Sequence, residues 1–158
     1  MPGKANAMNH RVVTRNSDHH RMFALKAAKE AERVLSFFEK ERPHDNRPRQ
    51  AIEAIKAWAK GKRELRMTEV RKLSLGSHAA ARDAKSDSAR FAARAAGQAV
   101  ATWHVPTHAM AVPAYACKAI AASKNRLRSK QDGHHIRRTK PQGSRALTSR
   151  SRDRKSVV

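Results

Sequence analysis

The sequence is poor in cysteine and in aromatic residues and has no long apolar run, and each shortage argues against a class of protein. Cys117 is the only cysteine among 158 residues, so no disulfide can form within the chain. Aromatic side chains make up 4%, which is little for the stacking platforms of single-strand nucleic-acid binders. No apolar run approaches the roughly 18 residues that a membrane helix needs. We therefore expect neither a disulfide scaffold nor a membrane partner.

The first residues, MPGKANAMNHRVVTRN, carry positive charge but have no apolar segment of the kind found in secretory signals. A lone cysteine also fits a reducing compartment. The cytoplasm is therefore the simplest predicted location.

The excess of positive charge is unevenly distributed. The chain has 35 Lys and Arg against 13 Asp and Glu, for a formal net charge of +22. Residues 1–122 hold 23 basic and 11 acidic side chains, whereas residues 123–158 hold 12 and 2. Residues 123–158 also lack a periodic apolar face, so we predict a disordered basic tail there, and a disordered arm over residues 1–17.

Helical periodicity dominates between these two ends, and strand signals are nearly absent. The pattern predicts an all-α fold, a single compact bundle of about five helices over residues 18–122. Proline, glycine and capping residues divide it into helices at 18–41, from Pro48 to Gly61, at 68–85, from a cap at Asp87 or Ser88 to Pro106, and at 107–122. Pro113 lies inside the last helix, so we expect a kink or a split there.

Apolar residues recur at helical spacing and predict the core. One stripe runs along the first helix and another along the second, where Trp58 shares a face with Ile52 and Ile55. Trp103 fits either the core or an exposed interface anchor. The first stripe consists of Phe23, Ala27, Ala31, Val34 and Phe38.

Several segments resemble, in the same order and at similar spacing, the immunity-five-like helical domain family of immunity proteins from bacterial polymorphic toxin systems. The resemblance covers about residues 18–122. It implies an all-helical, non-catalytic domain that protects a cell by binding a cognate toxin, and it brings no catalytic residues. The segments are EAERVLSFFE (30–39), DNRPRQAIEAIKAWAKG (45–61), HAAAR (78–82), ARAAGQAVATWHV (93–105), Thr107-His108-Ala109 and Ala114-Tyr115-Ala116.

The chain departs from this family in two places. Pro106 and Pro113 stand where members usually have small helix-compatible residues. Members often continue with a helix containing a Trp-Gln pair and a Leu-Pro step, and here the basic tail takes its place. We therefore expect a truncated or frame-shifted family member, in which the family domain ends near residue 122 and residues 123–158 do not belong to it.

Reaction chemistry has little support in the sequence. His104 and His108 are four residues apart, which is the spacing of a metal-binding pair on one helix. However, Pro106 lies between them. A third ligand would have to come from His78 or His10. Hydrogen bonding between helices is the better interpretation, so we expect no metal and no cofactor. Cys117 could act as a nucleophile with one of these histidines, but a lone cysteine is more often a small apolar residue. We therefore do not expect an enzyme.

A charged loop between the first two helices is a candidate for partner binding, because loops held by rigid helices often carry function. It contains Asp45, Arg47 and Arg49, although helix capping explains Asp45 equally well. The candidate polar cluster or interface comprises Asp45, Arg47, Arg49, His78, Trp103, His104, His108 and Tyr115.

Two functions remain open on this evidence. The first is a helical protein that neutralises a cognate toxin by direct protein binding. The second is a basic helical protein that binds nucleic acid through nonspecific phosphate contacts from the basic tail and from the arginines of the second and third predicted helices.

Overall fold

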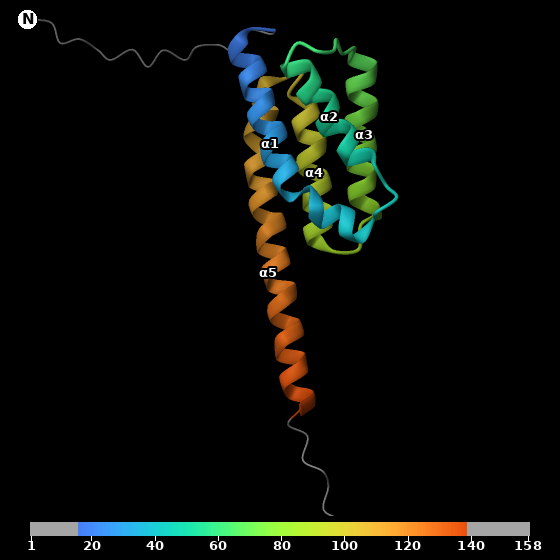
Figure 1. Cartoon of the computed structure of the whole chain (residues 1–158), viewed down its shortest axis with the longest axis vertical. Helices are drawn as coiled ribbons and strands as arrows, with labels where there is room; N and C mark the ends of the chain where they lie inside the picture. Colours follow the sequence, from blue (N-terminus) through green and yellow to red (C-terminus); the bar gives the residue numbers. More distant parts are fainter. Residues whose placement is uncertain (1–15, 139–158) are drawn as a thin grey trace, which may run out of the picture.

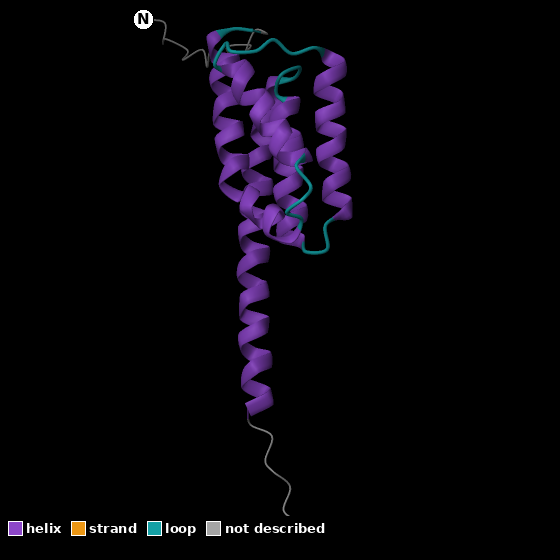
Figure 2. Ribbon diagram, turned by 45° about the vertical axis from the view of Figure 1, so that its right-hand side comes forward, coloured by secondary structure: helices purple, strands orange, loops and turns teal. Residues whose placement is uncertain are grey.

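The computed structural model describes the backbone of residues 16–138 and the side chains of residues 16–131. Five α-helices and one short 3-10 helix form a single bundle, and no strand occurs in this part of the chain (Figures 1 and 2). The predicted all-α fold is confirmed. The elements are α1 (Asp18–Glu41), α2 (Arg47–Ala59), α3 (Met67–Asp83), α4 (Asp87–Ala101), η1 (Pro106–Met110) and α5 (Ala111–Arg138).

Serine side chains cap two of the helices. Ser17 Oγ accepts a hydrogen bond from the His20 amide at 3.2 Å and begins α1. Ser86 Oγ accepts one from the Ala89 amide at 3.3 Å and begins α4. The cap of α4 thus lies one residue before the predicted Asp87. Asp87 instead occupies the first turn, where its negative charge complements the positive end of the helix dipole.

Helix α4 lies at the centre and packs against α1, α2, α3 and α5 (Figure 1). Its sequence explains this position, because alanines, Gly97 and Val100 bury almost the whole circumference of the helix. A helix that is apolar on all sides has to be surrounded by other elements. Its small side chains leave room for the backbones of neighbouring helices to come close.

The large side chains of the core come mainly from α1 and α2. Phe38, Ile52, Ile55 and Trp58 are at most 2% exposed, as their spacing predicts. Phe23 differs from its prediction and is 38% exposed. The reason is that other residues of α1, namely His20, Ala24 and Ala28, set the inward face at this end of the helix.

Pro113 neither kinks nor splits a helix. The break falls earlier, between η1 and α5, and α5 begins at Ala111. Pro113 therefore lies in the first turn of α5, where a backbone amide has no partner within the helix and proline is tolerated.

The basic segment after residue 122 differs from its prediction as well. Helix α5 continues to Arg138, and its lower half projects beyond the rest of the bundle (Figure 1). Between Pro113 and Gly133 the chain has neither proline nor glycine, so a helix anchored in the bundle can propagate through Lys, Arg, Leu and Gln at little cost. The tail beyond Arg138 and the arm before Asn16, including His10, lie outside the described residues.

Candidate functional site

The predicted charged loop differs in the structure, because Arg47 and Arg49 lie in the first turn of α2 and only Asp45 lies in the connection from α1. Ion pairs within the protein hold all three side chains. The Arg47 guanidinium donates to Asp45 from Nε at 2.9 Å and from Nη2 at 2.6 Å. The same Nη2 lies 2.7 Å from Asp83 Oδ2 at the end of α3. The hydrogen bonds from Arg47 lower the pKa of Asp45, and those to Asp45 and Asp83 raise the pKa of Arg47. Arg47 thus joins α2 to the connection from α1 through Asp45 and to the end of α3 through Asp83.

Arg49 also has partners on neighbouring turns and helices. Its Nε donates to Glu39 Oε1 of α1 at 2.6 Å, and its Nη1 lies 3.9 Å from Glu53 Oε1. The hydrogen bond to Glu39 raises the pKa of Arg49. The main contacts of Asp45, Arg47 and Arg49 are therefore within the protein, between neighbouring helices and turns. Only the exposed faces of the two arginines are open to a partner.

The three predicted histidines of the helical region meet in one place, which we call the histidine pocket. His78, His104 and His108 line a hollow of about 250 Å³ together with Gln98 and Leu75. His108 Nδ1 donates to Gln98 Oε1 at 2.8 Å, and the ring centroids of His104 and His108 lie 5.3 Å apart. The sequence analysis anticipated a hydrogen bond of this kind between helices.

Positive charge and burial both act on the histidine pocket. Desolvation lowers the pKa of His78, and the nearby Arg94 and Arg82 lower it further. No carboxylate lines this hollow. Among the described side chains, no three His, Cys, Asp or Glu residues are grouped so that they could hold a metal ion.

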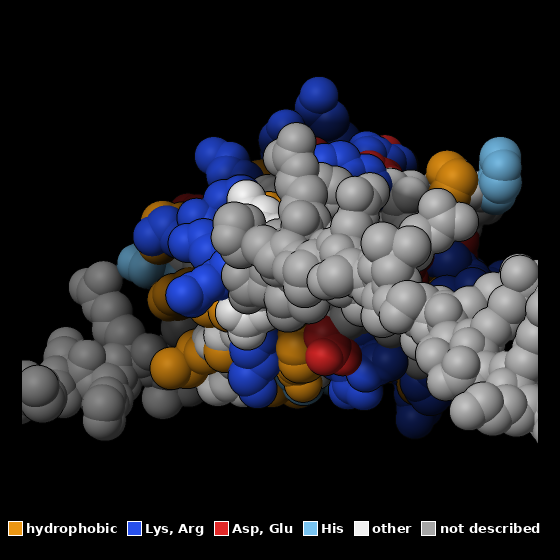
Figure 3. All heavy atoms as spheres, turned by 90° about the horizontal axis from the view of Figure 1, so that it is seen from below, with side chains coloured by type: hydrophobic (Ala, Val, Ile, Leu, Met, Phe, Trp, Pro, Cys, Tyr) orange, Lys and Arg blue, Asp and Glu red, His pale blue; other side chains and the backbone are white. Residues whose placement is uncertain are grey.

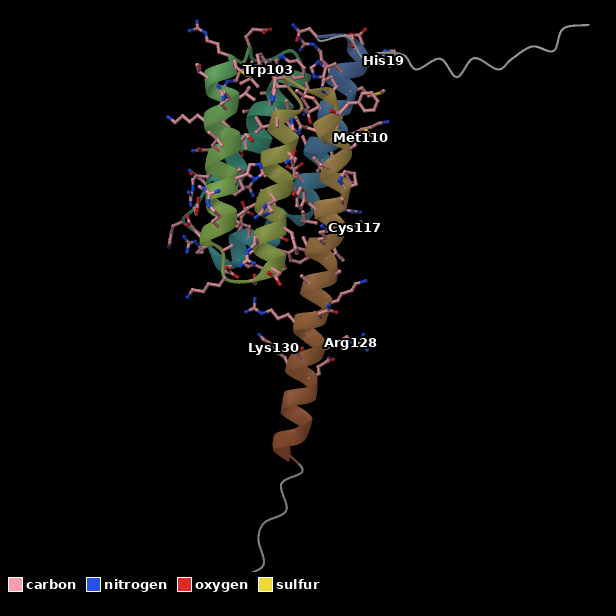
Figure 4. All side chains as sticks on the ribbon, turned by 180° about the vertical axis from the view of Figure 1, so that it is seen from behind. His19, Trp103, Met110, Cys117, Arg128 and Lys130 are labelled. Carbon is pink, nitrogen blue, oxygen red and sulfur yellow. The ribbon has the colours of Figure 1, made fainter. Side chains whose placement is uncertain are left out.

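The remaining candidates lie apart from the histidine pocket. Trp103 is 7% exposed and belongs to the core at the end of α4 (Figure 4). Tyr115 on α5 is half-buried and packs 6.4 Å from the Phe91 ring, centroid to centroid. Cys117 is exposed on α5 and does not line the pocket. The predicted residues thus form two separate groups, and Trp103, Tyr115 and Cys117 lie outside both.

A larger depression lies where α5 leaves the bundle, and we call it the α5 groove. It consists of two adjoining hollows of about 810 and 580 Å³ that share Glu41, Ser88 and Arg126. The end of α1, the start of α4 and the projecting half of α5 form its walls. Its cationic lining residues are Lys40, Lys85, Lys118, Arg126 and Lys130, and its apolar ones include Phe37, Phe91 and Leu127.

Glu41 joins the two walls of the α5 groove that come from α1 and α4. Its carboxylate accepts hydrogen bonds from the backbone amides of Lys85 at 2.6 Å and of Ser86 at 3.1 Å. Desolvation is the largest influence and opposes ionisation. The hydrogen bonds from Ser86 and Lys85 and the charge of Arg126 together outweigh it, so the pKa of Glu41 is lowered.

A comparison with protein families decides the identity of the chain. The family model described as Imm-5 like putative immunity protein matches residues 14–140. The chain belongs to this family. No curated protein and no solved structure matches the chain.

The range of the match in this immunity-family protein includes the whole of α5. The sequence analysis placed the end of the family domain near residue 122, but the matched residues continue to 140 and α5 to Arg138. The projecting half of α5 therefore lies inside the region that matches the family. Within residues 16–138, none of the helices has the length and apolar character needed to cross a bilayer.

Sequence reasoning missed the α5 groove of this family member because it treated the basic segment as unstructured. A usable signal was present. Arg126 and Lys130 are four residues apart, and Leu127 lies between them in a stretch free of proline and glycine. Helical spacing would have put the two cations on one face.

Proposed function

We propose that this immunity-family protein protects a bacterial cell by binding a cognate toxin directly, without catalysing a reaction. The observation that carries the proposal is the family match over residues 14–140. The match spans the entire bundle and the projecting part of α5, so the proposal concerns the described domain as a whole. The cytoplasm is the proposed location.

The arrangement of side chains supports a binding role. Charged groups near the predicted loop form ion pairs between helices, and the histidine pocket and the α5 groove are open at the surface. A rigid bundle with open, chemically distinct surfaces can exclude a toxin's substrate by covering its site. Stable inhibitory interfaces of this kind bury roughly 1,200–2,000 Å².

A rescue experiment tests the proposal. A candidate toxin, sought among the genes that neighbour the gene of this protein, is expressed from an inducible promoter, with or without this protein, and growth is followed. We expect growth to be restored only when this protein is present, and the two purified proteins to elute together from a sizing column. Continued growth arrest despite normal expression of both proteins would overturn the proposal.

A second candidate function is nonspecific nucleic-acid binding, which the net charge of +22 favours. Such binding depends on counterion release and weakens steeply with salt. The two candidates separate when a fluorescent RNA and the toxin are titrated at low and at physiological ionic strength. If the toxin complex persists at physiological ionic strength while the RNA dissociates, the immunity function is supported. If the RNA complex persists and the toxin does not bind, the nucleic-acid function is supported.

A further inference from the structure

The projecting half of α5 is an unusual surface, because half of a long helix stands clear of the bundle that anchors it (Figure 1). Residues 124–131 are all exposed, whereas Val112, Ala116 and Ala119 in the first half are buried. The part from residue 123 to Arg138 spans about 24 Å at 1.5 Å per residue. It therefore offers four turns of helix against which another helix can lie.

Positive charge is in excess in the α5 groove, which five cations and two carboxylates line. Within the described residues, none of its five cations has a carboxylate within ion-pair distance. Its two acidic residues already have partners, because Glu41 accepts from the Lys85 and Ser86 amides and Asp87 pairs with Arg90 at 2.8 Å. Figure 3 views this end of the molecule and shows Lys and Arg side chains on several sides of it, with acidic and apolar side chains among them. The groove therefore presents positive charge to a partner.

Apolar side chains accompany these cations. Phe37 and Phe91 are half-buried in the walls, and Leu127 is 60% exposed on α5. Lys118 Nζ lies 5.8 Å from the centroid of the Phe91 ring, so a cation and an aromatic side chain adjoin in this part of the groove. The combination of an apolar floor and a cationic rim fits an amphipathic protein segment better than it fits a phosphate backbone, which needs only the cations.

Charge also excludes two occupants from within the protein. Residues 139–158 carry six Lys and Arg against one Asp, so this segment would bring like charge to the groove. A second copy of the chain that docked groove against groove would place the same cations opposite each other. An occupant of opposite charge has to come from another protein.

We infer that the α5 groove is the docking site for an acidic amphipathic helix of the partner protein. The apolar face of this helix packs on Phe91 and Leu127, and its carboxylates pair with Arg126, Lys130 and Lys85. That the partner is a toxin rests on the proposed function. The acidic, helical character of the docked segment rests on the groove itself.

Helix α5 supplies a matched pair of variants for the test. Arg126 and Lys130 line the groove, whereas Lys124 and Arg128 have the same spacing on the same helix and do not line it. Figure 4 shows that Lys130 and Arg128 extend to opposite sides of α5. The test variant is R126E/K130E and the control is K124E/R128E. Both change the net charge equally, and circular dichroism verifies that both fold.

The probe is a synthetic helical peptide of about 16 residues, which is long enough to cover the projecting part of α5. It is built from Leu, Ala and Glu, and Leu recurs every three or four positions. A peptide of the same composition in scrambled order serves as its control. Fluorescence anisotropy measures binding to the full-length protein. We expect the R126E/K130E substitutions to weaken binding at least roughly tenfold and the control substitutions less than about threefold.

Three outcomes would overturn the inference. The first is equal weakening by both variants, which would mean that general charge attraction dominates. The second is equal binding of the scrambled peptide. The third is that polyuridylate displaces the peptide and that R126E/K130E weakens the binding of polyuridylate more than K124E/R128E does. This result would assign the groove to nucleic acid.

The rescue experiment keeps this inference separate from the proposed function. If the R126E/K130E variant still neutralises the toxin as the wild type does, the groove inference fails and the proposed function stands. If the peptide binds as expected but no toxin is neutralised by the wild type, the proposed function fails and the groove remains a protein-docking site.

Discussion

Gly97 gives the ring of His78 the space that it occupies between α3 and α4. A Cβ atom at this position would lie 2.9 Å from His78 Nε2 and 3.0 Å from Cε1, closer than side chains pack. The need for glycine here comes from tertiary contact, because the helix itself would be more stable with alanine.

The Gly97→Ala substitution is therefore expected to destabilise the protein by about 1–3 kcal/mol, since the His78 ring has to move from its half-buried position. Urea unfolding monitored by circular dichroism measures the change. Gly76 provides the control, because a Cβ there would lie an ordinary 3.9 Å from Arg47 Cδ. Gly76→Ala should stabilise the protein by about 0.5–1 kcal/mol. Equal effects of the two substitutions would contradict this account of Gly97.

Single residues also show which parts of the site the sequence could predict. The hydrogen bond of His108 was anticipated, because a polar side chain in an alanine-rich helix needs a partner. The partner itself, Gln98, was not predicted. Likewise Arg47 reaches Asp83, which lies 36 residues away in the chain. Spacing along the chain constrains neighbours on the same helix, but it contains little information about which helices meet.

At the scale of elements, α5 combines an anchored half with an exposed half. The first half has alanines and Val112 that pack into the bundle, whereas residues 124–131 rely on helix propensity and on continuity with the first half. The two halves should therefore respond differently to a helix-breaking substitution.

The Leu127→Pro substitution tests this division. Proline inside a helix costs about 3 kcal/mol, so the projecting half should unwind, helical signal should fall and binding of the acidic peptide should be lost. The melting temperature of the bundle should remain unchanged, because no buried residue lies beyond Ala119 in the described side chains. Leu127→Ala is the control, since it keeps the helix and removes only the apolar contact. A large fall in melting temperature on Leu127→Pro would show that the projecting half stabilises the bundle.

The bounds of α1 to α4 were predictable from the sequence to within a few residues, because serines, prolines and Gly61 mark the ends of helices through local chemistry. The two misjudged regions of α5 have physical reasons. Pro113 was treated as a residue of the helix interior, but α5 begins only two residues earlier. The basic segment was judged by its lack of an apolar face, although a helix with an anchored start needs none over its last turns.

At the scale of the whole molecule, small residues at the centre determine the packing, and positive charge at one end determines the character of the surface. Alanines on α4 allow four helices to surround a fifth, which fixes a rigid bundle. The excess positive charge lies at the surface, and the cations that line the α5 groove are the basis of the acidic partner that we infer.

The most direct test of the immunity account is a titration of the purified toxin's activity with this protein. Stoichiometric neutralisation predicts that residual activity falls linearly and reaches its minimum at a fixed molar ratio, because each toxin molecule is covered by this protein. Undiminished activity at large excess would contradict the account, as would complete inactivation by a small fraction of an equivalent, which would indicate catalysis.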